Sequence, residues 1–411
     1  MTKSSIALIA SRLWIMLSTL GIVLLNTRFL GTAGQGDAGI INLGILIVAS
    51  LSMFVTGGAV VFIMPRLKVG STIFPALMWS TLTAIASFIF FKIVPIIPDE
   101  FIIHVVLLGW MQSLFTFNMQ VLLGKLRIMP YTISLIIQSA LSFISLLLFF
   151  ILEIDITIQA FLKSLYISFV ITLLFTIWAA KDEWLKMNLK EWKKALSELF
   201  NYGKWGQTGN VFHLLNQRLN FSLLDILIVQ GKASAGILSI AMYGAEVVWT
   251  VAKSLSTEQY ALIANSTDRK EQQLLTKKNM RTSLLIGIAA ALGIWIVPPG
   301  FYFWILPDRV DTIALANALL WLAPGIVANS ASIIFAHYFS GIGKHYHNGI
   351  ASALGFAIGL PASILLISNM GLEGAAAGIS ISFFIQVLYF IWYWRKERPT
   401  TGDRRPTTGD W

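Results

Sequence analysis

Apolar stretches long enough to cross a membrane recur along the whole chain, with short polar breaks between them. A helix needs about 20 apolar residues to cross a hydrocarbon core roughly 30 Å thick, and backbone groups there find no water, so such stretches must be helical. Only 12% of the residues are charged, against about 25% in soluble proteins. The sequence therefore predicts an all-α integral membrane protein. The twelve expected spans cover residues 4–26, 39–64, 74–94, 101–123, 131–152, 156–180, 206–229, 236–257, 283–305, 313–339, 349–367 and 371–394.

Positive charge is distributed unevenly between the two sides of these spans. The breaks on the side of the N-terminus hold most of the 30 Lys and Arg residues, whereas the other breaks hold only Lys232 and Arg309, with Arg28 at the end of the first span. Cytoplasmic loops of membrane proteins are enriched in Lys and Arg. We therefore expect both termini in the cytoplasm. The formal net charge of +10 then reflects topology rather than a nucleic-acid partner.

The longest break, residues 181–204, divides the chain into two halves of six spans. Apolar residues recur in it at helical spacing opposite a lysine-rich side, at Leu185, Leu189, Trp192, Leu196 and Leu199. Such a segment forms an amphipathic helix on the anionic inner leaflet, or a solvated connector. The predicted domains are an N-terminal six-helix lobe (1–180), the connecting helix (181–204), a C-terminal six-helix lobe (205–394) and a disordered cytoplasmic tail (395–411).

Two short matches indicate an internal repeat. Residues 38–41 (AGII) open the second span and residues 235–238 (AGIL) open the eighth. Gly-Lys pairs at 124–125 and 343–344 end the fourth and tenth spans. Because each half has an even number of spans, the sequence predicts parallel repeats about an axis along the membrane normal.

Polar side chains inside several spans fall on single helix faces. An ionisable group at the bilayer centre costs about 2.5–3.5 kcal/mol on insertion scales, so it usually faces a protein interior or a wet cavity. Steps of three, four and seven residues keep side chains on one face. The stripes contain Ser5, Arg12, Thr19 and Asn26 in the first span, Gln138 in the fifth, Asn210, Gln217, Arg218, Ser222 and Asp225 in the seventh, and Tyr243, Glu246, Thr250 and Lys253 in the eighth.

These stripes have two interpretations. Polar residues hold membrane bundles together through interhelical hydrogen bonds and ion pairs, whereas intramembrane charges also mark transport paths. In the second case Arg12, Arg218 and Lys253 line a cavity between the halves and favour an anionic ligand, phosphate above all. Glu246 then pairs with Lys253 in the empty state or carries a coupling proton or sodium ion, and Asp225 is a second candidate for either role.

Three strings carry a resemblance to a known family: FLGTAGQGDAGIINLGI (29–45), LSELFNYGKWGQTGN (196–210) and QRLNFSLLDILIVQGKASAGILSIAMYGAEVV (217–248). They resemble the Wzx-type O-antigen and polysaccharide flippases of the MATE-like (multidrug/oligosaccharidyl-lipid/polysaccharide) exporter superfamily. The resemblance extends to Trp394, because span number, orientation and the division into halves also agree. It implies a MATE-like flippase fold whose two six-helix lobes open alternately to the two sides of the membrane.

The resemblance also implies a function. Such a protein moves undecaprenyl-pyrophosphate-linked oligosaccharide across the bacterial inner (cytoplasmic) membrane during polysaccharide biosynthesis, alongside polymerase and chain-length proteins. Arg12, Arg218 and Lys253 correspond to the family's basic cavity residues, which meet the pyrophosphate, and the uncharged stripe residues would face the sugars. We expect the chain to lack the two additional C-terminal spans typical of lipid II flippases, which makes that substrate less favoured.

Two other functions stay open. A proton- or sodium-coupled multidrug exporter of the same superfamily would centre its cavity on carboxylates, because its usual substrates are cationic. A membrane O-antigen polymerase or ligase would place its chemistry in a large periplasmic loop, but the predicted outer loops are short. The chain has no cysteine, and no nucleophile–base pair or metal-ligand cluster stands out. We therefore expect neither an enzyme nor a cofactor.

Overall fold

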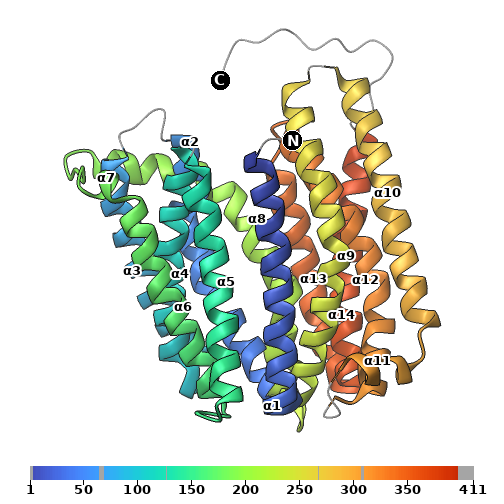
Figure 1. Cartoon of the computed structure of the whole chain (residues 1–411). Helices are drawn as coiled ribbons and strands as arrows, with labels where there is room; N and C mark the ends of the chain where they lie inside the picture. The colour runs from blue at the N-terminus through green and yellow to red at the C-terminus, as the bar shows by residue number, and fades with distance from the viewer. Residues whose placement is uncertain (1–2, 64–68, 126, 267, 307–309, 397–411) are drawn as a thin grey trace.

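The computed structural model describes residues 3–63, 69–125, 127–266, 268–306 and 310–396. This part of the chain is helical and contains no strand (Figure 1). The helices are α1 (Lys3–Thr56), α2 (Ala59–Ile63), α3 (Gly70–Ile93), α4 (Asp99–Gly124), α5 (Ile128–Ile151), α6 (Ile158–Ala179), α7 (Lys181–Trp184), α8 (Trp192–Leu227), α9 (Gly231–Asn265), α10 (Arg269–Ile296), α11 (Pro299–Ile305), α12 (Thr312–Gly341), α13 (Tyr346–Met370) and α14 (Leu372–Lys396).

The predicted all-α membrane fold is confirmed. In the described part of the chain, 10 helical stretches are long and apolar enough to cross a membrane. One of them, Trp14–Val61, contains two predicted spans, whereas α8, with the seventh, is too polar to be counted. The twelve predicted spans therefore overlap the observed helices.

The first two predicted spans are joined by a bend within α1 rather than by a loop. Gly31 has φ 74° and ψ −176°, while the residues on both sides remain helical. This backbone conformation is essentially restricted to glycine. The bend reverses the chain, so that the two parts of α1 cross the bundle in opposite directions.

The connecting segment differs from its prediction. The structure has no continuous helix over 181–204: α7 ends at Trp184, and Leu185 and Leu189 are exposed and outside helices. Then α8 begins at Trp192 and continues without a break into the seventh span. Leu199, on this first part of α8, is buried in a cluster with residues of α1, α2, α3 and α4. Its apolar face therefore packs on protein.

The polar break predicted between the eighth and ninth spans is largely helical. The structure extends α9 to Asn265 and starts α10 at Arg269, so both helices rise above the rest of the bundle in Figure 1. The ninth span ends earlier than predicted, at Ile296 instead of residue 305. Pro298 and Pro299 follow, and proline cannot continue a helix because it lacks an N–H and clashes with the preceding turn.

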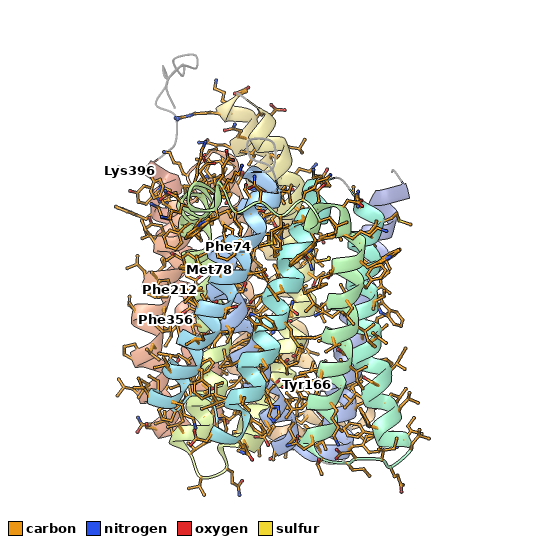
Figure 2. All side chains as sticks on the ribbon, turned by 90° about the vertical axis from the view of Figure 1, so that its left-hand side faces the viewer. Phe74, Met78, Tyr166, Phe212, Phe356 and Lys396 are labelled. Carbon is orange, nitrogen blue, oxygen red and sulfur yellow. The ribbon has the colours of Figure 1, made fainter. Side chains whose placement is uncertain are left out.

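The start of α1 and the end of α14 lie at the same end of the bundle. Figure 1 marks the N-terminus at the top, and Figure 2, turned about the vertical axis, shows Lys396 at the top as well. We call this the upper end and the opposite one the lower end. Tyr166, whose hydroxyl is 3.1 Å from Nδ1 of His104, lies toward the lower end in Figure 2.

Close packing distinguishes α12, α13 and α14. A Cβ added to Gly325, Gly359 or Gly378 would collide with a serine on the neighbouring helix. Small residues of this kind let membrane helices approach closely. Aromatic rings add to the packing of α8 on α13, where Phe212 and Phe356 have ring centroids 5.5 Å apart (Figure 2). These helices pack closely on one another and line one side of the cavity described next.

Candidate functional site

A cavity of about 1480 Å³ lies between the first part of α1 and five helices of the C-terminal half. Its lining comprises Ile15, Met16, Thr19 and Leu20 of α1; Gly209, Asn210 and His213 of α8; Tyr243, Glu246, Val247, Thr250, Lys253, Ser254, Thr257 and Glu258 of α9; Asn329, Ser332, Ile333, Ala336, His337 and Ser340 of α12; Asn348 and Ser352 of α13; and Gln386 and Phe390 of α14. On α12, α13 and α14 these residues belong to the half nearer the upper end, and on α1, α8 and α9 they reach the middle of the helix, so the cavity extends from the middle of the bundle toward its upper end.

The two walls of this cavity differ in polarity. On α1, the lining residues Ile15, Met16 and Leu20 are apolar, and the hydroxyl of Thr19 donates to the carbonyl of Ile15 in its own helix. The facing helices contribute mostly amide, hydroxyl, imidazole and charged side chains. The cavity can therefore hold a molecule with one polar and one apolar side.

A second cavity, of about 10 Å³, lies between α8, α13 and α14. This volume is room for about one water molecule. It cannot hold an organic substrate, and the larger cavity is therefore the candidate site.

Glu246 forms an ion pair with Arg218, which corrects the predicted pairing with Lys253. Nη2 of Arg218 lies 2.5 Å from Oε1 of Glu246, with side-chain exposures of 11% and 28%. The guanidinium also lies over the ring of Tyr243, 5.5 Å from its centroid. Arg218 does not line the cavity. It contacts the lining residues Tyr243 and Glu246 from outside the cavity, and Glu246 neutralises its charge.

Among the described lining residues, Lys253 is the Lys or Arg side chain that could bind an anionic ligand. It is exposed and forms no ion pair with any described residue. Glu258 lies farther along α9 on the same cavity and was missed by sequence reasoning, because it falls just beyond the predicted end of the eighth span. The charges of these two side chains balance, so the described part of the lining is not strongly cationic.

The other predicted site residues are divided between the cavity and the interior. Thr19, Asn210, Tyr243 and Thr250 line the cavity as expected. Arg12 and Ser5 lie on α1, but their side chains fall outside the described residues.

The remaining predicted residues serve the interior of the bundle. Gln217 is hydrogen-bonded to His213, and Nε2 of Gln138 donates to Oε1 of Gln112 at 2.7 Å. Asn26 and Ser222 are each 1% exposed, and neither lines the cavity. Of these four, Gln138 makes a contact between helices, joining α5 to α4. The Gln217 bond to His213 lies within α8, and Oδ1 of Asn26 and the hydroxyl of Ser222 are buried without a hydrogen-bond partner among the described residues.

Several functional candidates were missed because their helices look like plain membrane spans. Asn329, Ser332, Asn348, Ser352 and Gln386 line the cavity from α12, α13 and α14. Four of them stand among small and apolar residues, whereas Asn348 follows a polar stretch and lies one residue before the predicted eleventh span. Asn329 and Ser332 are three residues apart, a helical spacing that could have identified them.

At the lower end the space between α1 and α9 is closed by direct backbone contact. A Cβ added to Gly36 would overlap the carbonyl oxygen of Lys232, and a Cβ added to Gly236 would overlap that of Thr32. Nε2 of Gln35 also donates to the hydroxyl of Ser239 at 3.0 Å. These residues, 32–39 and 232–239, form what we call the lower contact. It includes residues 235–238 and overlaps residues 38–41, one of the two matches that suggested an internal repeat.

Charged side chains surround the lower contact. Nζ of Lys232 lies 3.0 Å from a carboxylate oxygen of Asp37 on α1 and 3.9 Å from one of Glu100 on α4. Asp225, predicted as a candidate for ion coupling, interacts electrostatically with Lys232. It therefore belongs to this lower group rather than to the cavity. Among the described residues no cluster of three or more His, Cys, Asp or Glu could hold a metal ion.

Comparisons with known proteins identify the fold. A multidrug resistance MATE family transporter of the MOP superfamily, in an inward-facing conformation, matches with a TM-score of 0.71 and 13% identity over 93% of this chain and 94% of that one. The lipid II flippase MurJ, in an inward closed conformation, matches with a TM-score of 0.74 and 16% identity over 95% of this chain and 87% of that one. The Vibrio cholerae MATE transporter VcmN, in a bent form, matches with a TM-score of 0.56 and 14% identity over 96% of each chain. No family model and no curated protein matches the chain. The chain has the fold of MATE and MurJ transporters, and these similar structures are transporters rather than enzymes.

Proposed function

We propose that the protein is a flippase that moves undecaprenyl-pyrophosphate-linked oligosaccharide across the bacterial inner membrane. The observation that carries this proposal is the two-sided cavity, with apolar residues of α1 facing polar residues of the C-terminal half. A lipid-linked sugar has the same division, since its headgroup is polar and its tail is apolar. The tail would lie along Ile15, Met16 and Leu20 while the headgroup meets the polar wall.

The size and chemistry of the cavity support a large, mostly uncharged headgroup. A volume of about 1480 Å³ exceeds the 300–1,000 Å³ of typical pockets for drug-sized ligands. Lys253 is available to a phosphate, because Glu246 is already neutralised by Arg218. Arg12, which lies on the facing helix α1, is proposed as a second phosphate ligand. Sugars would meet the amides and hydroxyls.

Alternating access follows from the two ends of the cavity. With the upper end in the cytoplasm, as the Lys and Arg distribution predicts, the cavity faces inward and the lower contact seals the outer side. Transport then requires the lower contact to open and the upper half to close around the substrate. A proton or sodium gradient, or the substrate itself, would bias the two states through different affinities for them.

A multidrug exporter is the second candidate, favoured by Glu258. This carboxylate lines the cavity and has no ion-pair partner among the described residues, so it could bind a cationic drug. The exporter would need Glu258 for resistance to cationic drugs, whereas the flippase needs Lys253 for export of the glycan.

Replacing Lys253 tests the proposal. In cells whose surface glycan depends on this protein, Lys253→Ala should lower surface glycan by about tenfold, because a charge-assisted hydrogen bond to phosphate is lost. Lipid-linked glycan should accumulate on the cytoplasmic leaflet, and the protein level should not change. Lys278→Ala is the matched control, since Lys278 is an exposed lysine of α10 outside the cavity.

Normal glycan export by the Lys253→Ala variant would contradict the proposal. Sensitivity of the deletion strain to cationic drugs, with rescue by wild type but not by Glu258→Gln, would favour the exporter instead.

A further inference from the structure

Four residues of the cavity lining carry buried polar atoms that have no hydrogen-bond partner in the described structure. These atoms are both amide atoms of Asn329, the hydroxyl oxygen of Ser332, Oδ1 of Asn348 and Nε2 of Gln386. Asn329 is 0% exposed and Gln386 is 2% exposed. Buried polar atoms in folded proteins are nearly always hydrogen-bonded. We call these four residues, three with amide side chains and one serine, the amide cluster. The question is which ligand could supply their missing hydrogen-bond partners.

Two polar side chains that join helices away from the cavity, Asn118 and Gln138, are bonded to other side chains. The amide of Asn118 on α4 donates to Thr176 and accepts from the Trp184 indole. The Gln138 amide donates to Gln112. Unpaired buried polar atoms also occur away from the cavity, for example Oδ1 of Asn26 and the hydroxyl of Ser222. The amide cluster differs from them because its four residues all line the cavity, where a ligand can supply the missing partners.

The mixture of donors and acceptors in the amide cluster excludes a simple ion. An amide nitrogen only donates and an amide oxygen only accepts. A cation would leave the nitrogens of Asn329 and Gln386 unpaired, and an anion would leave the oxygens of Asn329 and Asn348 unpaired. A hydroxyl group both donates and accepts, so a ligand with several hydroxyls can satisfy all of them.

One member of the amide cluster, Gln386, is linked to Lys253 through His213. Gln386 hydrogen-bonds to His213, and His213 in turn feels the charge of Lys253. Gly355 leaves room for Gln386, since a Cβ there would lie 2.9 Å from its Nε2. Asn329 and Ser332, three residues apart on α12, lie on one face of that helix. Lys253 and the amide cluster line the same cavity, so a ligand with its phosphate at Lys253 could extend toward these side chains.

We propose that the amide cluster is a carbohydrate subsite, which binds the hydroxyls of the sugar directly linked to the phosphate held by Lys253. This inference rests on the proposed function. A site built to hydrogen-bond hydroxyls discriminates strongly against analogues that lack them, because its own buried groups stay unpaired. The amide cluster would thus select a glycosylated lipid pyrophosphate over a bare one.

The test compares lipid pyrophosphates with and without a sugar. Binding of farnesyl pyrophosphate is measured on the full chain in lipid nanodiscs, next to farnesyl pyrophosphates that carry one hexose, N-acetylhexosamine or deoxyhexose. Wild type should bind at least one sugar-bearing probe about tenfold more tightly than farnesyl pyrophosphate. Asn329→Leu and Ser332→Ala should lose this gain and keep their affinity for farnesyl pyrophosphate.

Ser330→Ala is the matched control. Ser330 lies two residues from Ser332, is 1% exposed, donates its hydroxyl to the Ile326 carbonyl and does not line the cavity. It should keep the sugar-dependent gain. Ser332→Ala removes a single oxygen, so folding is expected to survive even where Asn329→Leu fails to fold.

The outcomes separate this inference from the proposed function. Suppose that wild type binds farnesyl pyrophosphate and Lys253→Ala does not. If no sugar then increases the affinity of wild type, or if Ser332→Ala keeps that increase, the subsite proposal is wrong while the flippase proposal stands. If farnesyl pyrophosphate and all the sugar-bearing probes fail to bind to wild type, both are wrong.

Discussion

Helices α1 and α9 meet in opposite ways at the two ends of the bundle. In the lower contact, Gly36 and Gly236 bring the two backbones so close that neither position has room for a Cβ. In the upper half the same two helices stand on opposite sides of a cavity of about 1480 Å³. One helix pair is thus closed at one end and open at the other.

The middle of α9 and its lower end each carry an ion pair, here called the upper and the lower pair, and the two pairs have different partners. Arg218–Glu246 joins α8 and α9 within the C-terminal half and is mostly buried. Lys232 joins α9 to Asp37 and Glu100 of the N-terminal half and is 38% exposed. The upper pair therefore lies within the C-terminal half, whereas the lower pair connects the two halves, which separate at this end in the proposed transport cycle.

The largest effect is expected from breaking the upper pair. Glu246→Ala leaves the Arg218 guanidinium buried without its partner, which should lower the free energy of unfolding by about 3 kcal/mol. The double variant Arg218→Met/Glu246→Leu should recover most of this loss, because it removes both charges. Unfolding in mixed detergent micelles, followed by tryptophan fluorescence, measures the difference.

A double variant as unstable as Glu246→Ala would show that packing, and not the unpaired charge, is responsible. Equal stability of Glu246→Ala and wild type would mean that the pair contributes little to the cavity wall.

A smaller effect is expected from adding one methyl group to the lower contact. Gly236→Ala should disfavour the closed lower end by about 1–3 kcal/mol, since overpacking against a backbone carbonyl forces the helices apart. Because the chain has no cysteine, Ser239→Cys provides a single reporter of opening. Its labelling by a maleimide should be at least about tenfold faster in the Gly236→Ala background.

Gly244→Ala serves as the control on the same helix, because a Cβ there meets nothing within 4 Å. It should label at the rate of the Ser239→Cys parent. Equal rates for the two alanine variants would mean that the glycine crossing does not hold the lower end shut.

The sequence predicted the helices well and their ends less well. Hydropathy sets the spans, because each stretch has to satisfy its backbone within the bilayer. It says little about where a helix stops beyond the membrane, and so α9 and α10 were predicted too short there. The bend at Gly31 was also missed, since a single glycine with positive φ turns the chain without a polar loop.

Stripe spacing found the face of α9 but assigned the wrong partner. Glu246 and Lys253 share a face, yet Arg218 on the neighbouring helix is the residue that reaches Glu246. Spacing along one helix cannot report which side chains meet between helices. Sequence reasoning missed the amide cluster because uncharged residues such as Asn329 resemble the usual polar contacts between membrane helices.

The smallest effect is expected from the lower ion pair. Lys232→Met should destabilise the closed lower end by about 1 kcal/mol or less, because pairs that are partly open to solvent gain little over hydration. Asp37, with 15% side-chain exposure, loses its partner in this variant, and so a modest rise in Ser239→Cys labelling is expected. Salt screens exposed charges, and high ionic strength should bring wild type closer to Lys232→Met while leaving Gly236→Ala unchanged. A salt-independent difference between wild type and Lys232→Met would instead assign the effect to the packing of the lysine chain, whose Nζ lies 5.9 Å from the centroid of Phe101. The lower end would then be closed by shape alone.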